Sequence, residues 1–293
     1  MLVAETRAMP VGLCLGGRDA ADAQALAEAP LQQWPEAAVT GVELNVSVDN
    51  TRAVRFYEKC GFVCDRTGLY GTRWTSRTLG NEGACMSDWI ENGPADAALC
   101  LILAHGAGAA MDTPFMQRIA EGLGEAGYRV VRFEFPYMRR SRAEGRKRPP
   151  DREAVLLDHW RETVAAVRAR HSGAVAIGGK SMGGRMASLV ADELDVAGLL
   201  VLGYPFHPPG KPHRPRVAHL AGITTPTLIL QGERDPFGRP DEVAGYDLSG
   251  RIQVAWLADG DHGFKPRKRS GLTEPENLSE AIERAAAFLR NLT

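Results

Sequence analysis

The stretch Gly178-Gly179-Lys180-Ser181-Met182-Gly183-Gly184-Arg185 lies between two segments of different character. Ala174 to Ile177 before it is an apolar run typical of a buried strand, whereas Met186 to Ala191 after it has helical composition. The sequence therefore predicts a strand, a sharp turn and a helix in that order. A serine in such a turn is held in a strained backbone conformation. Its neighbours favour glycine because a Cβ atom on them would collide with nearby backbone.

The five residues from Gly179 to Gly183 fit the pattern G-x-S-x-G, in which a strand-to-helix turn presents a serine hydroxyl as a nucleophile. A hydroxyl is a weak nucleophile, so it needs a base beside it and an acid that orients the base. A glycine-rich turn without chemistry would show the same five residues. A base and an acid in matching positions elsewhere in the chain would distinguish the two interpretations.

Residues 98–293 alternate apolar runs with helical patterns, which predicts an α/β fold with a mostly parallel sheet and helices on both faces. The predicted strands are Ala98 to Ala104, Tyr128 to Phe135, Ala174 to Ile177, Ala197 to Leu202, Thr227 to Leu230 and Ile252 to Leu257. The predicted helices are Pro114 to Ala126, Arg152 to Arg170, Gly184 to Leu194 and Pro275 to Leu292. Right-handed crossovers bring the turns after these strands to one edge of the sheet.

The turns after three of these strands carry a serine, an acid and a histidine. Ser181 follows the third strand, Asp235 the fifth and His262 the sixth. This is the order of nucleophile, acid and base in α/β-hydrolases. We predict that His262 takes the proton of Ser181, and that Asp235 orients the imidazole and stabilises its charged form.

Other acids lie near these positions and leave alternatives open. Glu233 is two residues from Asp235 and is a rival for its role, and Asp235 could instead only cap its own loop. Asp259 and Asp261 could form local turns beside His262. The assignment depends on the order and the strand placement of all three residues taken together.

Backbone N–H groups are expected to stabilise the oxyanion that forms when a serine attacks a carbonyl. One would come from Met182, the residue after the nucleophile, and the other from Gly106 or Ala107 in the loop after the first strand. His105 in that loop is expected to hold the backbone rather than to act as a second base. Lys180 could make the mouth of the site positive or could extend its ammonium group to water.

Five segments carry a resemblance to a known family: Leu101 to Ala109, Met111 to Met116, Gly178 to Arg185, Gln231 to Gly238 and Gly260 to His262. They resemble the small α/β-hydrolase-like proteins that include a testis-expressed protein and a subunit of a histone acetyltransferase complex. A more distant similarity is to the dienelactone hydrolases. The resemblance implies an α/β-hydrolase fold with a complete triad and supplies no substrate. A non-catalytic interaction module with the same fold is therefore a second hypothesis.

Residues 1–80 have a different pattern. Val42 to Val48 alternates apolar and polar residues, which predicts a strand, and a further strand is predicted to begin at Phe62. Helices are predicted over Ala21 to Trp34 and over Arg52 to Cys60, the second of them capped by the polar residues before it. The segment is therefore expected to be a small α+β unit.

Leu44 to Phe62 resembles the closing half of a GNAT-family N-acetyltransferase. That resemblance implies that Asn50 and Tyr57 would lie near the thioester of acetyl-CoA. The first strands and helices of a complete domain are absent, and Asp19 and Asp22 open the helix that would hold the pyrophosphate, where they would repel it. We therefore expect an incomplete GNAT-like segment, and acetyltransferase activity with acetyl-CoA is a third hypothesis.

The stretch from Thr75 to Pro94 is polar and has a linker composition, with Gly80, Asn81, Gly83, Ser87, Asn92, Gly93 and Pro94. The predicted organisation is thus a fusion of a GNAT-like segment over residues 1–80, a linker over residues 81–97 and an α/β-hydrolase domain over residues 98–293.

The bulk composition limits partners and compartment. A net charge of −1 gives no reason to expect a nucleic acid or a membrane surface as the main partner. The five cysteines are odd in number and show no paired spacing, so neither a disulfide framework nor a zinc site is indicated, and we expect a cytoplasmic protein with free thiols. A serine mechanism needs no cofactor and no metal.

Basic residues crowd the segments after the second, fourth and sixth predicted strands. They are Arg139, Arg140, Arg142, Arg146, Lys147 and Arg148, then Lys211, His213, Arg214 and Arg216, and last Lys265, Arg267, Lys268 and Arg269. A basic rim at the predicted site would attract an ester or thioester that carries a carboxylate or phosphate. Charged loops that only face water would give the same pattern.

Overall fold

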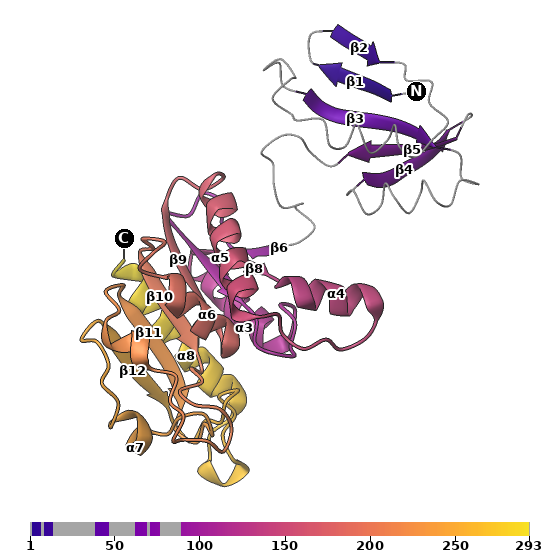
Figure 1. The fold of residues 1–293 in the computed structure, drawn as a ribbon. Coiled ribbons are helices and arrows are strands. Elements are labelled where there is room, and N and C mark those ends of the chain that lie inside the picture. The colour runs from indigo at the N-terminus through magenta and orange to yellow at the C-terminus, as the bar shows by residue number, and fades with distance from the viewer. Residues whose placement is uncertain are drawn as a thin grey trace. The chain divides into compact units, whose positions relative to one another are not determined.

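The computed structural model describes residues 89–292 in full and, ahead of them, the backbone of five strands. The chain divides into two compact units, Met1–Gly83 and Ala84–Thr293. Figure 1 shows the strands of the first unit in indigo and violet, and the second unit in colours that run from magenta to yellow.

The described strands of the first unit form one antiparallel sheet in the order β2-β1-β3-β5-β4. They are β1 (Leu2–Thr6), β2 (Met9–Leu13), β3 (Val39–Val46), β4 (Phe62–Gly68) and β5 (Gly71–Ser76). β3 overlaps the strand predicted from Val42, and β4 begins at Phe62 as predicted. The two predicted helices of this unit, together with Asn50 and Tyr57, lie outside the described residues.

The second unit is built on a sheet in the order β12-β11-β10-β9-β7-β8-β6. Its strands are β6 (Trp89–Asn92), β7 (Leu99–Ala104), β8 (Arg129–Phe133), β9 (Ala174–Lys180), β10 (Gly198–Leu202), β11 (Thr227–Gly232) and β12 (Ile252–Leu257). All neighbouring pairs are parallel except β6 with β8. The six strands predicted for this region and its mostly parallel sheet are confirmed.

Strand β6 corrects the predicted extent of the linker. Trp89 pairs with Phe133 and Asn92 with Val130, so residues 89–92 form the antiparallel edge of the sheet. The polar and glycine-rich composition around them concealed a strand of only four residues, whose ladder partner β8 lies about 40 residues further along the chain. The hydrolase domain predicted to begin at residue 98 therefore includes this earlier strand.

Helices cover both faces of the sheet (Figure 1). α3 (Pro114–Glu125) and α8 (Glu274–Arg290) pack on one face, and α5 (Glu153–Arg168) and α6 (Met182–Val190) pack on the other. The four predicted helices are confirmed, and α6 begins two residues earlier than expected. Shorter turns of helix are α7 (Pro240–Val243), η3 (Ala218–Ala221) and η4 (Lys268–Ser270).

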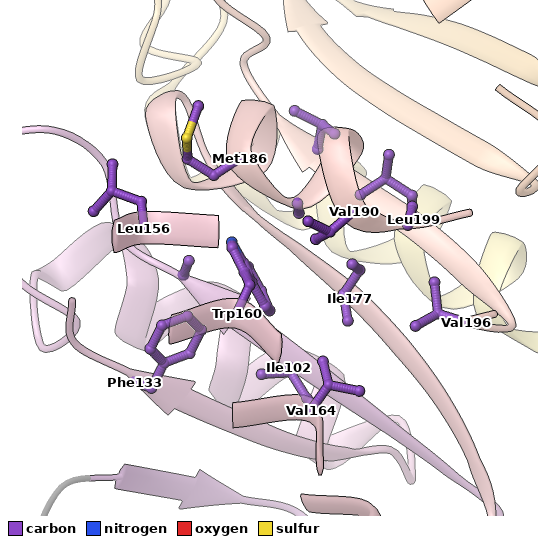
Figure 2. Close-up of a cluster of buried hydrophobic side chains, with 14 of the residues drawn as sticks. Ile102, Phe133, Leu156, Trp160, Val164, Ile177, Met186, Val190, Val196 and Leu199 are labelled. Carbon is purple, nitrogen blue, oxygen red and sulfur yellow. The ribbon is translucent and has the colours of Figure 1, made fainter. Parts of the chain in front are cut away.

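The alternation of side chains along β7 explains the two cores. Leu99, Leu101 and Leu103 point into the core beneath α3 and α8. The alternate residues Cys100, Ile102 and Ala104 point into the core beneath α5 and α6. All six residues of β7 are buried. Figure 2 shows the second core, where Trp160 and Val164 of α5 meet Ile102 and Ile177 of the sheet. A strand buried on both faces is apolar throughout, which is why the sequence reveals it.

The basic segment after the second predicted strand begins with a helix that the sequence analysis did not predict. α4 (Pro136–Glu144) holds the basic residues Arg139, Arg140 and Arg142. Pro136 suits the first turn of a helix because it needs no N–H partner there, and Gly145 ends the helix in the left-handed conformation at φ 63°. The many charges of this segment hid these two signals.

Candidate active site

Ser181 lies in the turn between β9 and α6, with φ 51° and ψ −114°. A positive φ is strained for a residue with a side chain, and here the surrounding backbone enforces it. A Cβ atom on Gly179 would lie 2.4 Å from the Ala104 carbonyl oxygen, and one on Gly183 would lie 2.5 Å from the His105 carbonyl oxygen. The two glycines of the pentapeptide are therefore required by close packing against the end of β7.

His262 and Asp235 come together beside this turn. His262 Nδ1 lies 2.7 Å from Asp235 Oδ2, and the carboxylate is completely buried. Asp235 also accepts hydrogen bonds from Gln231 Nε2 at 3.0 Å and from the Phe237 N–H at 2.9 Å. With Nδ1 engaged by the carboxylate, Nε2 is the imidazole nitrogen that is left for a proton transfer.

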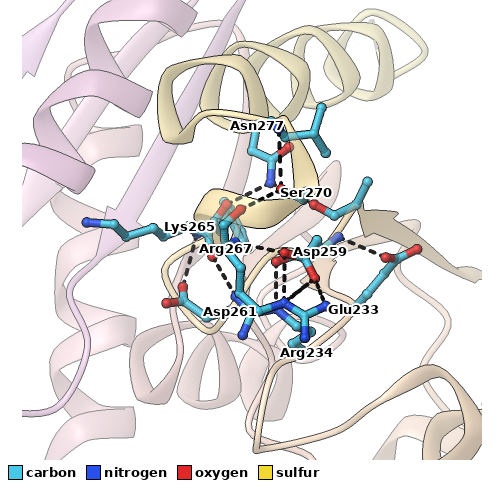
Figure 3. Close-up of polar contacts among 11 residues, drawn as sticks. Glu233, Arg234, Asp259, Asp261, Lys265, Arg267, Ser270 and Asn277 are labelled. Carbon is cyan, nitrogen blue, oxygen red and sulfur yellow. Dashed lines mark hydrogen bonds and ion pairs between the residues drawn. The ribbon is translucent and has the colours of Figure 1, made fainter.

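The rival acids have other partners. Glu233 accepts a hydrogen bond from the Asp259 N–H at 2.8 Å, and Asp259 is ion-paired with Arg267. Asp261 Oδ1 accepts from the Gly263 N–H at 2.8 Å, which is the local turn considered as its alternative role. Figure 3 shows these contacts. Of the four acids near His262, Asp235 is the one hydrogen-bonded to its ring.

Asn277 holds the loop that carries His262. Its buried amide at the start of α8 donates to the Ala258 carbonyl at 3.0 Å and to the Phe264 carbonyl at 2.8 Å (Figure 3). The Phe237 ring packs against the imidazole with centroids 4.5 Å apart. The imidazole is therefore fixed from α8 on one side and from the turn after β11 on the other.

Ser181 and His262 line a common pocket of about 580 Å³ with the predicted oxyanion loop. The residues that line it are Gly106, Ala107, Ala109, Pro150, Asp151, Glu153, Leu156, Lys180, Ser181, Met182, Arg185, Met186, Pro205, Pro209, Arg216, Phe237 and His262. Within residues 89–292, the Ser181 hydroxyl makes no hydrogen bond. Catalytic hydrogen bonds are often long without substrate, so a free hydroxyl that faces the same pocket as the base is compatible with a nucleophile.

The predicted oxyanion donors lie in this pocket as well. Met182 is the first residue of α6, where a backbone N–H has no acceptor inside its own helix, and Gly106 and Ala107 belong to the loop after β7. A Cβ atom on Gly106 would lie 3.7 Å from the Ser181 Cβ, which shows how closely the loop approaches the nucleophile. The arrangement can support acyl transfer from an ester or thioester to a serine.

Residues 97–290 match the sequence family described as "Alpha/beta hydrolase domain". The chain belongs to this α/β hydrolase family. The match runs from just before β7 to the end of α8.

Solved structures share the fold of this α/β hydrolase. A serine hydrolase without a lid from Xanthomonas campestris is 21% identical, with a TM-score of 0.53 over 67% of this chain and 88% of that one. A serine hydrolase homologue from Coxiella burnetii is 18% identical, with a TM-score of 0.54 over 74% and 100%. An esterase domain from Rhodothermus marinus is 16% identical, with a TM-score of 0.51 over 78% and 97%.

His105 of the hydrolase holds the oxyanion loop, as predicted. The ring is buried, and its Nδ1 lies 2.8 Å from the Gly106 carbonyl oxygen. Its Nε2 accepts a hydrogen bond from the Phe135 N–H at 3.1 Å. Burial lowers the pKa of His105, so the ring is neutral near pH 7. A ring with both nitrogens engaged in the loop is not available as a second base.

Lys180 of the hydrolase does not extend to water, which corrects one of its two predicted roles. Its ammonium group donates to the His262 carbonyl and lies over the rings of Phe115 and Phe264, at 5.1 Å and 5.4 Å from their centroids. Burial lowers the pKa of Lys180 to about 8, against the opposing influence of Asp235 and Asp261. Sequence reasoning missed this inward direction because the partners come from distant elements.

Several residues that line the pocket of the hydrolase or lie beside it were also missed. Gln231 orients the buried carboxylate, and Phe237 covers the imidazole. Arg185 lies four residues after the nucleophile, where helical spacing alone could have placed it near the pocket. Arg216 was noted only as one of many basic residues, and its position in the pocket had no sequence signal.

Six of the fourteen basic residues of the predicted rim are ion-paired with acids: Arg140, Arg142, Arg146, Arg148, Lys265 and Arg267. Arg142 pairs with Glu134 at 2.7 Å, Arg148 pairs with Glu144 at 2.5 Å, and Arg267 pairs with Asp259. The described part of the chain offers no ion-pair partner to Arg216. Of the fourteen rim residues, Arg216 is the one that lines the pocket.

Residues 89–292 contain no group of three His, Cys, Asp or Glu side chains arranged to hold a metal ion. Within the part of the chain that the structure describes, no helix combines the length and the apolar character needed to span a bilayer.

Proposed function

We propose that this α/β hydrolase is a serine hydrolase that cleaves a small ester or thioester through an acyl-enzyme. The observation that carries the proposal is the hydrogen bond between His262 and the buried Asp235, placed in one pocket with the strained Ser181. A buried carboxylate that orients a histidine beside a pocket-lining serine is the arrangement that acyl transfer requires.

The proposed reaction has two halves. Ser181 Oγ attacks the carbonyl carbon while His262 Nε2 takes its proton, and the oxyanion receives N–H groups from Met182 and from Gly106 or Ala107. The carbon–oxygen or carbon–sulfur bond then breaks, and the leaving group takes the proton from the imidazolium. Water, deprotonated by the same imidazole, hydrolyses the acyl-serine and restores the free enzyme. Asp235 stabilises the imidazolium in both halves, and no cofactor or metal enters the scheme.

The pocket favours a substrate with an apolar body and an anionic end. Leu156, Met186 and Phe237 are among the apolar residues of its wall. Arg216 has no ion-pair partner in the described part of the chain. Partial burial and, to a smaller extent, repulsion from Arg185 lower the pKa of Arg216. Arg185 itself gives one guanidinium nitrogen to Glu153 at 3.0 Å and keeps a buried Nε without a partner among residues 89–292. We therefore propose an ester or thioester that bears a carboxylate or phosphate.

A fluorophosphonate probe tests the nucleophile. The intact chain is expected to be labelled, and Ser181→Ala is expected to abolish labelling while Ser270→Ala, which changes an exposed serine, leaves it unchanged. A folded wild-type chain that is not labelled and hydrolyses no ester in a panel would contradict the proposal. That result would favour the non-catalytic interaction module instead.

Paired substrates test the anionic end. We expect Arg216→Gln to raise KM for p-nitrophenyl hemisuccinate about 10-fold, the loss of one charge-assisted contact, and to leave KM for p-nitrophenyl acetate within about 2-fold. Arg214→Gln changes a neighbouring exposed arginine that does not line the pocket and is the matched control. Equal effects of both variants on both esters would show that Arg216 acts only through the general charge of the surface.

The finer family assignment and the first unit remain proposals. We propose that the second unit belongs with the smaller group that includes the testis-expressed protein, on the motifs quoted above. For residues 1–80 we propose an incomplete acetyltransferase-like segment, in which Asn50 and Tyr57 are the residues to test. Calorimetric titration of acetyl-CoA into the intact chain is expected to show no heat of binding, and a saturable signal lost in Tyr57→Ala would contradict that expectation.

A further inference from the structure

Lys180 lies between Gly179 and Ser181 in the turn from β9 to α6, which we call the elbow, and its environment is unusual. Lys180 is the last residue of β9, in the centre of the sheet, with β7 on one side and β10 on the other. Its side chain crosses the carboxyl edge of the sheet and ends at the His262 carbonyl. The chain segment that carries the nucleophile is thus tied directly to the loop that carries the base, 82 residues later.

The ammonium group is enclosed on several sides. Phe115 of α3 and Phe264 of the His262 loop present their ring faces to it at 5.1 Å and 5.4 Å. On a further side, a Cβ atom on Gly203 would lie 2.8 Å from Lys180 Nζ and 3.1 Å from His262 Nδ1. Gly203 also has a φ of 73°, so this turn after β10 excludes side chains and leaves the space to the lysine and the histidine.

We propose that Lys180 is a positioning residue for His262: its ammonium group holds the His262 carbonyl against the end of β9 and so keeps the imidazole aligned between Asp235 and Ser181. The inference rests on the proposed function, because it assigns His262 the role of base. The ammonium group donates to the His262 carbonyl, so we assign its effect on the reaction to the position of the ring.

The charge of Lys180 makes this hold depend on pH. Burial lowers its pKa to about 8, so the ammonium is charged at pH 7 and neutral above about pH 9. The titratable groups that face it are Asp235 at the end of β11 and Asp261 and His262 in the loop after β12; α3 and the turn after β10 contribute only Phe115 and Gly203. Both carboxylates favour the charged lysine. A neutral amine is a weaker donor, so the hold on the loop weakens as the pH rises.

Two variants of Lys180 test the proposal in the intact chain. Lys180→Met keeps most of the stem and removes every donor, whereas Lys180→Arg keeps a charge that arginine does not lose in proteins. With p-nitrophenyl acetate at pH 7.5, we expect Lys180→Met to lower kcat about 10- to 100-fold, because the base is misaligned. KM is expected to stay within about 2-fold of the wild-type value. Lys180→Arg is expected to recover part of that loss. Lys211→Met, which removes an exposed lysine, is the control.

The pH profile separates positioning from general packing. Wild-type kcat should fall above pH 8, and this basic limb should be absent in both Lys180 variants. A folded Lys180→Met enzyme with wild-type kcat and the wild-type basic limb would overturn the proposal, and so would a lower kcat with that limb retained. Thermal unfolding of each variant shows whether it is folded.

A third measurement does not depend on activity. If wild-type Ser181 is neither labelled nor active, the proposed function fails. Hydrogen–deuterium exchange of residues 258–266 still tests whether Lys180 holds the His262 loop. Faster exchange in Lys180→Met than in wild type and Lys211→Met would support Lys180 as the anchor of the loop. Equal exchange in all three would overturn it.

Discussion

In the turn around Ser181 the backbone segments approach so closely that two positions cannot carry a side chain. The loop around His262 depends in addition on buried polar side chains from other elements. Any Cβ atom on Gly183 would lie 2.5 Å from the His105 carbonyl oxygen. The Ser181 hydroxyl, however, makes no hydrogen bond within the described chain. The histidine, in contrast, is bound to Asp235, and its loop is bound to Asn277.

The difference has a physical consequence for how each part responds to change. Steric fit in a closely packed turn is lost when an atom is added, and overpacking there strains the backbone. A polar network is lost when an atom is removed, because its buried partners are left unsatisfied. The turn around Ser181 should therefore be sensitive to small-to-large changes, and the loop around His262 to truncation.

The largest expected effect is on catalysis by the buried acid. Asp235→Asn keeps the shape of the side chain but removes the charge that stabilises the imidazolium, so kcat/KM for p-nitrophenyl acetate should fall about 10⁴-fold. Glu233→Gln is the matched control and should stay within a few-fold of wild type, because Glu233 binds the Asp259 N–H rather than the imidazole. If the two variants lost the same activity, the distinction between the acids would be wrong.

The steric side of the comparison is tested by adding one methyl group to the elbow. In Gly183→Ala the new Cβ atom meets the Ala104 and His105 carbonyl oxygens, neither of which can move without shifting β7. The free energy of unfolding should fall by up to about 3 kcal/mol. Gly250→Ala, with open space at the new Cβ position, should be nearly neutral in the same urea denaturation experiment. A stable Gly183→Ala protein would show that the elbow is less closely packed than described.

The polar side is tested by truncation at α8. Asn277→Ala leaves the Ala258 and Phe264 carbonyls without their donor and should lower the free energy of unfolding by about 1–2 kcal/mol. The rate of labelling of Ser181 should fall as well, because the His262 loop is released. Asn291→Ala at the other end of the same helix serves as the control. Unfolding and labelling that match the control would mean that Asn277 does not hold the loop.

A smaller effect is expected from pH, through the neutral His105 that supports the elbow. Burial keeps its folded pKa below the ordinary value of 6.5, so the unfolded chain binds more protons as the pH falls below that value. The stabilising contribution is complete above pH 6.5 and declines below it. Tm should therefore fall between pH 7 and pH 5.5, and the decline should be smaller in His105→Gln. An undiminished decline in that variant would assign the effect to His159 and His219, whose pKa values burial also lowers.

The same contrast explains what the sequence could predict. The elbow could be predicted because close packing demands glycine at fixed spacing from the serine, and the sheet could be predicted because β7 and its neighbours are buried on both faces. Asp235 and His262 were placed beside one another by strand order alone.

The supports of the base could not be predicted in this way. Gln231, Asn277 and Lys180 meet the His262 region from three different elements, and no spacing in the chain encodes those contacts. The short strand β6 was hidden for a similar reason, since a four-residue edge depends on a ladder partner that only the fold supplies.

Strand β6 also determines how the second unit can be shortened. Without residues 89–92, β8 would become the outermost strand, and its N–H and C=O groups would face outward along a segment that includes Val130, Val131 and Phe133. An open apolar edge of that kind pairs with the edges of other chains. A version of the protein that begins at residue 98 would thus be prone to aggregate by edge-to-edge strand pairing, whereas one that begins before Trp89 would keep its own strand as a protective cover.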